Sequence, residues 1–376
     1  MSAFGKEVEF YFVQVMPMEE KRKSMGWAVD ESSIPYLVLY YEEPKRAGQL
    51  ILESDVVLFG WTEGRIRDLE EARLSSGKLS FRVSERIYRE GQWKFVSPRG
   101  LAAKYREHVR YRHMPVYLLC TGAYVASDFS LINSYPDKML KWGYFPEGND
   151  SIGEKNYHRD KLHLCWAGRL IELKHPEFAV KLASKLKECG VDFVMDIVGD
   201  GPLRDELEFM VADRGLVGLV NLVGGKKPAE VRKYMAGADI FLFTSNYLEG
   251  WGAVVNEAME NGCAVVASAE AGAVPFLIED GENGLVYEDG SYEEFEKKVL
   301  SLVEDRDKIE NLGRMAAKTI ADTWNAGVAA GELVRFCKEF MENGDPKPAD
   351  RGPVSRAQII KAPGLRRTLS EKNHLE

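Results

Sequence analysis

The stretch Glu249-Gly-Trp-Gly-Ala-Val-Val-Asn-Glu257 follows an apolar run that ends in Thr244-Ser245. An apolar strand, a glycine-rich turn and a helix start bring backbone N–H groups and the positive end of a helix dipole to one point, which suits a phosphate. Glu249 and Glu257 add carboxylates that accept hydrogen bonds from hydroxyl groups. Taken alone, the stretch fits equally well a capped helix with an ordinary solvated glutamate.

A second stretch with the same layout lies upstream, from His163 to Pro176. It has the pattern of a strand, a turn at Gly168 and a helix opened by proline. Arg169 and Lys174 then fall at the carboxyl end of the strand, where open α/β sheets bind their ligands. Two cations there can neutralise a diphosphate, so we interpret the two stretches together as a site for a nucleotide sugar.

These residues resemble the retaining glycosyltransferases of family four, which have the α/β GT-B fold: two Rossmann-like domains that face a central cleft. Further motifs follow in the family's order: Val198-Gly-Asp-Gly-Pro-Leu203, Pro228 to Ser245, and Asp280-Gly-Glu-Asn-Gly-Leu-Val-Tyr287. The match is close over roughly residues 160 to 340 and loose before them. The resemblance therefore bears more on the donor side than on the acceptor.

The resemblance implies a role for each site residue. Arg169 and Lys174 would take the leaving diphosphate, and Glu249 would face the hydroxyls of the donor sugar; these three form the expected catalytic set. Glu257 would accept from the ribose hydroxyls. The other expected donor-binding positions are glycines and backbone N–H groups at strand ends: Gly168, Gly199, Gly224, Gly250, Trp251, Gly252 and Ala253.

The resemblance also implies a reaction, namely transfer of a hexose with retention from a nucleoside diphosphate to a glycan or lipid-linked acceptor in cell-surface polysaccharide synthesis. No protein nucleophile is needed, unlike the carboxylate pair of retaining glycosidases. We expect no cofactor and no metal, because the literal Asp-x-Asp match, Asp305-Arg-Asp307, is placed to cap a helix. A UDP-sugar and a GDP-sugar both remain open as the donor.

Length and patterning predict two domains. A chain of 376 residues with 45% hydrophobic content exceeds what one core usually holds. Apolar strands alternate with helical patterns on both sides of a polar segment, as in parallel α/β layers. We expect an acceptor-side domain at 1–146, a hinge at 147–160, a donor-binding domain at 161–343 whose last helix crosses back to the first, and a disordered tail at 344–376.

The expected elements follow from the same patterns. In the first half, strands are predicted at 8–15, 37–41, 56–59, 79–83 and 116–120, and helices at 66–74 and 100–111. In the second half, strands are predicted at 162–167, 193–198, 220–223, 240–243 and 264–267, with a final helix at 322–341.

Charge and cysteine content exclude some classes of protein. The net charge of −9 argues against nucleic-acid binding, which needs a basic footprint. The five cysteines include no Cys-x-x-Cys pair and indicate thiols in a reducing compartment. The sequence has neither a signal-peptide pattern nor a long apolar run, so we expect a cytoplasmic protein.

The segment Arg99–His113 has a basic, amphipathic helical pattern. Two interpretations fit it equally. The helix lies on the anionic inner face of a membrane and meets a lipid-linked acceptor there, or it is a solvated helix packed on its own domain.

The start of the chain departs from the family's pattern. The strand predicted at 8–15 is followed by Met16-Pro17-Met18, without the glycine-containing loop that usually approaches the donor. Either this loop is built differently, or residues before Met1 or a partner protein complete the first domain. Gly60-Trp-Thr-Glu-Gly64 is another candidate for the cleft, and a plain turn explains it equally well.

Two alternative functions follow from the anomalous start. One is a non-catalytic, nucleotide-sugar-binding partner subunit of the same fold. The other is a sugar-nucleotide epimerase or a phosphorylase of that fold, although phosphorylases usually have much longer chains and a lysine that holds pyridoxal phosphate.

Overall fold

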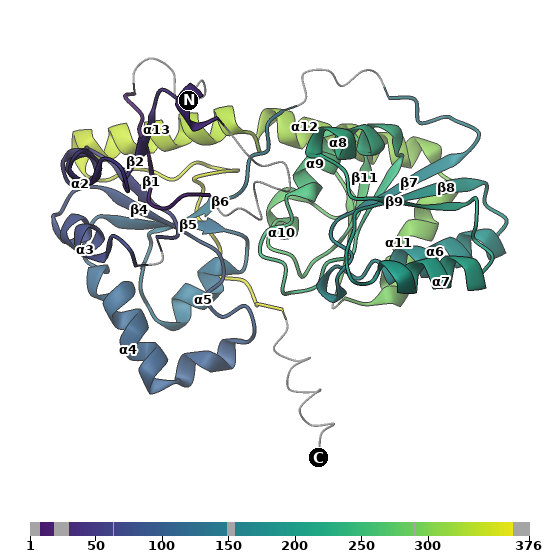
Figure 1. Ribbon diagram of the computed structural model, residues 1–376, viewed down its shortest axis with the longest axis horizontal. Coiled ribbons are helices and arrows are strands. Elements are labelled where there is room, and N and C mark those ends of the chain that lie inside the picture. Colours follow the sequence, from purple (N-terminus) through teal and green to yellow (C-terminus); the bar gives the residue numbers. More distant parts are fainter. Residues whose placement is uncertain (1–7, 19–29, 63, 149–154, 289, 364–376) are drawn as a thin grey trace.

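The computed structural model describes residues 8–18, 30–62, 64–148, 155–288 and 290–363. Two parallel β-sheets with helices packed around them lie next to each other along the long axis of the molecule (Figure 1). Within the described ranges, no helix combines the length and the apolar character needed to cross a bilayer.

The first-half sheet has the strand order β3-β4-β5-β6, and every neighbouring pair is parallel. Its strands are β3 (Val57–Phe59), β4 (Ser80–Ser84), β5 (Val116–Thr121) and β6 (Met139–Trp142). The segments around it include η3 (Glu31–Ser33), α2 (Pro44–Glu53), α3 (Arg67–Ser75), η4 (Gln92–Val96), α4 (Pro98–Glu107), η5 (Val109–Tyr111) and α5 (Val125–Leu131). A separate parallel pair is formed by β1 (Phe12–Gln14) and β2 (Leu37–Leu39).

The second-half sheet has the order β12-β11-β10-β7-β8-β9 and is also parallel. Its strands are β7 (Leu162–Ala167), β8 (Phe193–Val198), β9 (Val220–Gly224), β10 (Ile240–Phe243), β11 (Ala264–Ser268) and β12 (Leu285–Tyr287). The helices are η6 (Glu172–Lys174), α6 (Glu177–Glu188), α7 (Arg204–Asp213), α8 (Pro228–Gly237), α9 (Val254–Glu260), α10 (Val274–Leu277), α11 (Tyr292–Val303), α12 (Arg306–Asp322) and α13 (Ala326–Asn343).

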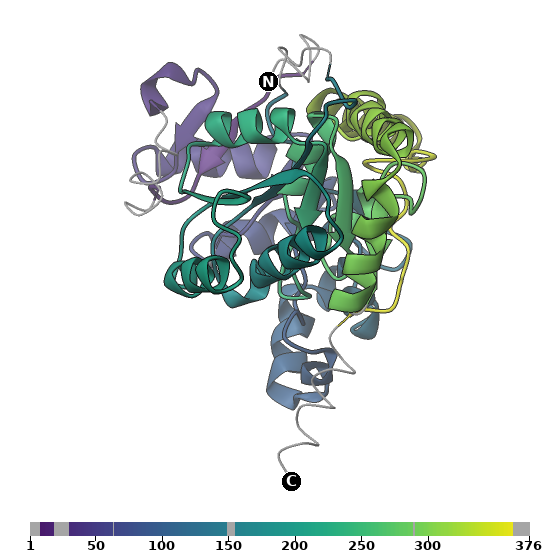
Figure 2. The ribbon, with the colours of Figure 1, turned by 90° about the vertical axis from the view of Figure 1, so that its right-hand side faces the viewer.

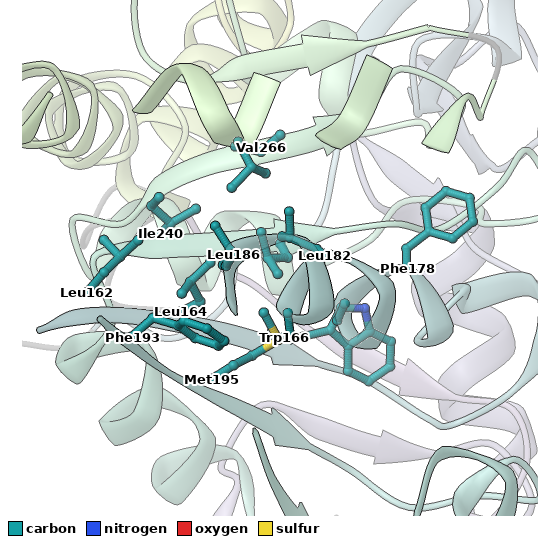
Figure 3. Close-up of a cluster of buried hydrophobic side chains, with 14 of the residues drawn as sticks. Leu162, Leu164, Trp166, Phe178, Leu182, Leu186, Phe193, Met195, Ile240 and Val266 are labelled. Carbon is teal, nitrogen blue, oxygen red and sulfur yellow. The ribbon is translucent and has the colours of Figure 1, made fainter. Parts of the chain in front are cut away.

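The central strands of this sheet are buried on both faces. Every residue of β10 and β11 is buried, which explains their continuous apolar composition. One core lies between the sheet and α6, where Trp166, Leu182 and Met195 pack together (Figure 3). A second core on the other face contains Trp251 and α9.

The last two helices connect the two halves. α12 packs on the second-half sheet through Ala316 and Ile320. After the turn at Thr323, Asn325 caps α13 by accepting a hydrogen bond from the Val328 N–H. α13 then packs on the first-half sheet, with Phe336 between Phe81 and Tyr117. The expected crossing of the terminal helix is confirmed (Figure 1).

Residues after α13 differ from the expected disordered tail. Gly344 ends the helix with φ of 74°, and the segment then runs antiparallel to β6. The Val354 N–H donates to Lys141 O at 2.8 Å, and the Ala357 N–H donates to Met139 O at 2.9 Å. The free edge of β6 thus supplies partners that composition alone does not reveal. Disorder is wrong for 344–363, and 364–376 lie outside the described residues.

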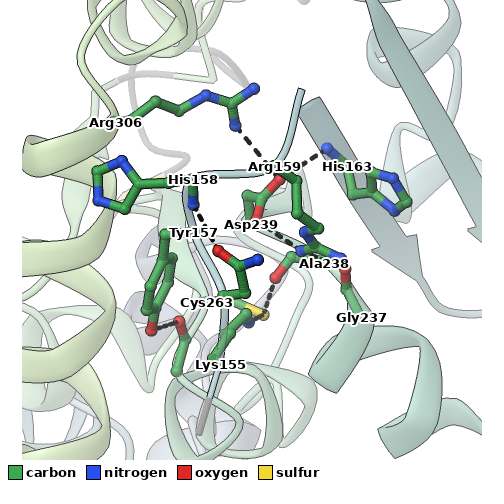
Figure 4. A network of polar contacts seen from close by, with 12 residues as sticks. Lys155, Tyr157, His158, Arg159, His163, Gly237, Ala238, Asp239, Cys263 and Arg306 are labelled. Atoms are coloured by element: carbon green, nitrogen blue, oxygen red, sulfur yellow. Dashed lines mark hydrogen bonds and ion pairs between the residues drawn. The ribbon is translucent and has the colours of Figure 1, made fainter. Parts of the chain in front are cut away.

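The predicted hinge is described only at 147–148 and 155–160. Residues from Lys155 onward are anchored on the second half, because Tyr157 is buried and donates to Gly262 O at 2.7 Å. Next to it the fully buried Asp239 accepts from Arg159 at 2.7 Å and from the His163 N–H at 2.8 Å (Figure 4). These contacts lie at the amino ends of β7 and β10, the edge opposite the predicted site.

Candidate active site

Three predicted donor-binding glycines meet at the carboxyl ends of β7, β8 and β9. The Gly168 N–H donates to Val198 O, and the Gly199 N–H donates to Gly224 O, both at 3.0 Å. Gly199 has φ of 147°, and a Cβ there would stand 1.8 Å from Gly168 O. Only glycine allows the strand ends to approach this closely, so the structure brings these three positions together.

The chain order of the strands reverses between β7 and β10. Strands β8 and β9 extend the sheet on one side of β7, whereas β10, β11 and β12 extend it on the other. Such a switch point leaves a crevice outside the carboxyl ends of the two strands, the usual ligand site of open α/β sheets. Gly168, Arg169 and Lys174 follow β7, and the turn Glu249–Ala253 follows β10.

The loop that carries Lys174 is tied across this crevice. The Thr244 hydroxyl, just after β10, lies 2.6 Å from Lys174 O and 3.0 Å from His175 O. Trp166 donates its Nε1–H to the same hydroxyl at 2.8 Å. His175 adopts the left-handed conformation, with φ of 47°, and ends the short η6 turn. The backbone that positions Lys174 is therefore fixed from both strands.

Lys174 and Glu249 meet directly. The Lys174 ammonium forms an ion pair with the Glu249 carboxylate, and both side chains are mostly buried, at 13% and 17% exposure. The ammonium also lies 5.9 Å from the centroid of the Phe243 ring. Arg169 is exposed and forms no ion pair with any residue that the structure describes. One predicted cation is thus paired at the crevice, and the other is open to solvent.

The glycine-rich turn presents unpaired donors. The N–H groups of Gly250, Trp251, Gly252 and Ala253 have no hydrogen-bond acceptor within the described ranges. Gly252 has φ of 95°, and a Cβ there would stand 2.7 Å from the Phe243 ring. Unpaired N–H groups at the start of α9 suit an anion.

The Trp251 side chain has a different task from its backbone. It is 1% exposed, and its Nε1–H donates to Asn256 Oδ1 at 2.8 Å. Its ring packs near Tyr144 of the first half and Trp324 after α12. The indole therefore joins the two halves. A ligand can reach only the backbone N–H of Trp251, because the indole N–H is bonded to Asn256.

Glu257 lies in the first turn of α9 and is partly buried. Burial raises the pKa of its carboxyl above the ordinary value, while Arg232 lowers that pKa and Glu260 raises it further. Its carboxylate has no hydrogen-bond or ion-pair partner among the described residues, so it is suited to accept hydroxyl protons from a ligand.

The facing edge of the first half lies very close to this turn. The Ala123 N–H donates to Gly272 O at 2.9 Å. A Cβ on Gly122 would stand 3.2 Å from Gly250 O and 3.2 Å from the Gly272 Cα. Three glycines therefore allow backbone-to-backbone packing between the carboxyl ends of β5, β10 and β11.

Glu85 is a site residue that sequence reasoning missed. It follows β4 and accepts a hydrogen bond from the Tyr144 hydroxyl at 2.8 Å. Arg89 lies 3.7 Å from its carboxylate and also donates to Leu248 O across the crevice. A Cβ on Gly250 would stand 2.4 Å from Glu85 Oε2. Its one sequence signal is its place directly after an apolar strand.

The Tyr144 hydroxyl is influenced by two carboxylates. Burial raises the pKa of its hydroxyl, and the charges of Glu85 and then Glu249 raise it further, with Arg89 opposing them. The first-half Glu85 thus contacts Tyr144 directly, and the charge of the second-half Glu249 acts on the same hydroxyl.

Two other candidate stretches remain, the turn Gly60–Gly64 and the Asp305–Asp307 match. Gly60–Gly64 has hydrogen bonds that remain local, from the Arg65 N–H to Thr62 O and from Thr62 to Glu70, and Glu63 lies outside the described residues. Asp305 caps α12 by accepting from the Lys308 N–H, as predicted. Within the described ranges no group of three or more His, Cys, Asp or Glu residues is arranged to hold a metal ion.

Part of the chain matches a known protein family. Residues 150–319 match the model of the family "Glycosyl transferases group 1". The amylovoran biosynthesis glycosyltransferase AmsK of Erwinia amylovora is 30% identical over 191 residues, which cover 48% of this chain and 47% of that protein. The lipopolysaccharide core biosynthesis glycosyltransferase LpsE of Rhizobium meliloti is 29% identical over 41% of this chain and 43% of its own. The chain spans less than half of the length of these relatives.

A solved structure extends the likeness to both halves. HepE of Anabaena, in complex with UDP and glucose, superposes with a TM-score of 0.57 at 16% identity and covers 81% of this chain and 86% of its own. At this identity the likeness shows the fold alone. The chain has the GT-B fold, as predicted.

Proposed function

We propose that this chain, whose residues 150–319 belong to the glycosyl transferases group 1, is a retaining hexosyltransferase that uses a nucleotide sugar. The acceptor we propose is a glycan or a lipid-linked sugar of cell-surface polysaccharide synthesis. The observation that carries the proposal is the meeting of Lys174, Glu249 and the unpaired N–H groups of the 250–253 turn at the β7/β10 switch point. The names of AmsK and LpsE support the polysaccharide context.

In the proposed reaction, negative charge develops on the leaving diphosphate while positive charge develops at the anomeric carbon. Lys174, Arg169 and the N–H groups at the start of α9 are placed to stabilise the diphosphate. Glu257 would hold the ribose through its hydroxyls. HepE was solved with UDP, and this favours a UDP-sugar over a GDP-sugar as the donor.

The Lys174–Glu249 pair suggests how the donor completes the site. The Lys174 ammonium and the Glu249 carboxylate neutralise each other, and both side chains are mostly buried. A donor diphosphate would take over the ammonium, and Glu249 would then turn to the sugar hydroxyls. Exchange of one anionic partner for another avoids leaving a buried charge unpaired, which is the costly alternative.

The acceptor side of the proposal involves Glu85 and Tyr144. Both lie on the first half, opposite the Glu249 turn, where an acceptor hydroxyl must approach the anomeric carbon. A carboxylate there can accept the hydrogen bond of that hydroxyl and orient it, and small misplacements of reacting groups cost large factors in rate. We propose 1–146 as the acceptor-side domain and 161–343 as the donor-side domain on this basis.

A second candidate function has one structural observation in its favour. β1 and β2 pair with each other and not with the four-stranded sheet. If the first half needs a partner protein to complete its cleft, the chain is a nucleotide-sugar-binding subunit. This candidate would be favoured if the chain alone binds the donor without releasing nucleoside diphosphate, and if a partner protein restores that release.

Metal removal tests the proposed handling of charge. Because cations of the chain face the diphosphate, donor binding and release of nucleoside diphosphate are expected to continue in excess EDTA. Product release is measured with a UDP-sugar before and after chelation. Complete loss of activity that only magnesium or manganese restores would contradict the assignment.

A further inference from the structure

The segment from η4 to α4 extends away from both sheets. It is the blue helical segment that lies beyond the rest of the first half in Figures 1 and 2. Not one residue of α4 is buried. Four large apolar side chains are exposed along the segment: Trp93 by 45%, Val96 by 63%, Leu101 by 40% and Tyr105 by 57%. We call these four, with the cations around them, the aromatic–basic surface.

The inner side of the segment is firmly attached. Phe95 packs against the first-half core, and Tyr111 is buried in it. Gln92 donates to Asp128 Oδ1 at 2.8 Å and to Ser127 Oγ at 2.9 Å. Ser97 caps α4 by accepting from the Gly100 N–H. The segment is thus held by η4 and η5, and α4 lies outside the core. The vesicle experiment below decides between a membrane-bound and a merely solvated α4.

Trp93 is held in place by a glycine. Gly91 has φ of 144°, and a Cβ there would stand 2.5 Å from the Trp93 Nε1 atom. The Lys94 ammonium lies 5.9 Å from the indole centroid. An exposed indole that is positioned by its neighbours in this way is suited to insert into a partner surface at little entropic cost.

The charge of the segment is opposite to that of the chain. Between Tyr88 and His113 seven arginine or lysine residues face two glutamates, although the chain has a net charge of −9. Lys94, Lys104 and Arg110 have carboxylate partners. Arg99 and Arg106 have no ion pair with any residue in the described part of the chain. They remain available to an external anion.

We infer that the aromatic–basic surface binds a membrane containing anionic phospholipids. Exposed aromatic and aliphatic side chains beside unpaired cations match the two layers of a bilayer interface, where rings enter the headgroup region and cations meet the phosphates. A surface that binds nucleic acid would need the cations, but it would not need the exposed apolar side chains of Val96 and Leu101. Lipid therefore explains both components.

The surface also lies on the chain segment that leads out of the crevice. Glu85 and Arg89 lie at the crevice, and Trp93 follows four residues later. An acceptor carried on a lipid would thus reach the crevice from the membrane side. This link to the acceptor rests on the proposed function, whereas membrane binding itself does not.

Vesicle flotation with the full chain tests the inference. Vesicles of phosphatidylcholine with about 30 mol% phosphatidylglycerol are expected to carry the protein at about 0.1 M salt and to release most of it near 1 M, whereas pure phosphatidylcholine carries little. Trp93→Ala with Tyr105→Ala, and separately Arg99→Glu with Arg106→Glu, should each weaken partitioning about tenfold or more.

Matched controls lie on the second half. Phe209→Ala removes a more exposed aromatic, at 70%, and Lys233→Glu with Lys297→Glu reverses two exposed charges. Both should partition like the wild type. Absence of binding to anionic vesicles, equal weakening by the controls, or tighter binding to single-stranded DNA than to vesicles would overturn the inference. Thermal shift with a UDP-sugar separates the outcomes, because failure of the proposed function removes that shift and leaves vesicle binding unchanged.

Discussion

Replacement of Lys174 by methionine is expected to lower the release of nucleoside diphosphate from a nucleotide sugar by about 10²–10³-fold, or about 2.7–4 kcal/mol. Methionine keeps much of the length and the packing against Phe243 but removes the charge that meets the leaving group. It also leaves Glu249 without its partner in a mostly buried place, so that the carboxylate repels the diphosphate. Both effects act on the transition state. Initial rates at saturating donor measure them.

Lys185→Met is the matched control for this change. Lys185 is 40% exposed on α6 and, within the described ranges, has Glu188 as its single ion-pair partner. Surface pairs of this kind contribute little, so its rate should stay within about twofold of the wild type. A Lys174→Met rate within that same range would remove Lys174 from the catalytic set.

The two glutamates should separate by ligand. Glu257→Gln is expected to weaken binding of the nucleoside diphosphate and of the nucleotide sugar by about 10–100-fold, because both ligands contain the ribose and charge-assisted hydrogen bonds contribute about 1.5–3 kcal/mol each. Glu249→Gln should spare the nucleoside diphosphate and impair the donor sugar or its transfer. Isothermal titration measures both ligands on each variant. Equal weakening of nucleoside diphosphate binding by both changes would contradict the roles.

The pH dependence of this binding follows from the burial of Glu257. Burial raises the pKa of its carboxyl, Arg232 lowers it and Glu260 raises it. Only the ionised form accepts both ribose hydroxyls, so affinity is present above the raised pKa and is lost as pH falls through it. The loss should therefore begin at higher pH than for an exposed glutamate. Glu257→Gln should flatten this part of the profile, whereas Glu293→Gln on α11 should not.

The second half of the fold could be predicted closely from the sequence. Its predicted strands coincide with β7 to β11 within one residue at either end. These strands are buried on both faces at the centre of a parallel sheet, which requires unbroken apolar runs. β6 and β12 were missed because each is short and mixes polar or half-buried residues.

The predicted strands at 37–41, 56–59, 79–83 and 116–120 match β2 to β5 within two residues, whereas the start of the chain and the segment after α13 are harder to predict. The strand expected at 8–15 is limited to Phe12–Gln14, and it pairs with β2 outside the main sheet. The segment 344–363 is ordered by pairing with β6, an interaction distant in sequence that leaves no local pattern. Edge pairing of this kind is made by backbone N–H and C=O groups, so the amino-acid composition of the segment does not indicate it.

In the candidate site, too, some residues could be predicted from local sequence patterns and others could not. Lys174, Glu249 and the glycines could be placed at the crevice from the sequence, because each lies at the end of its own strand or in the loop that follows it. Glu85 could not, because its meaning depends on the contact of two halves that are far apart in sequence. The position of Trp251 in the turn predicts a role for its backbone N–H, whereas the contact of its side chain with the first half depends on tertiary packing and leaves no local pattern.

Thermal unfolding with nucleoside diphosphates is the most direct test of the donor site. The wild-type chain is heated without added metal in the presence of UDP, GDP, ADP and the corresponding nucleotide sugars. At least one diphosphate and its sugar should raise the melting temperature, with a stabilisation of about 2.7 kcal/mol at 100 times the Kd. Lys174→Met combined with Glu257→Gln should abolish the shift. If no nucleotide stabilises the wild type, or if the shift survives both substitutions, the β7/β10 crevice is not a nucleotide-sugar site.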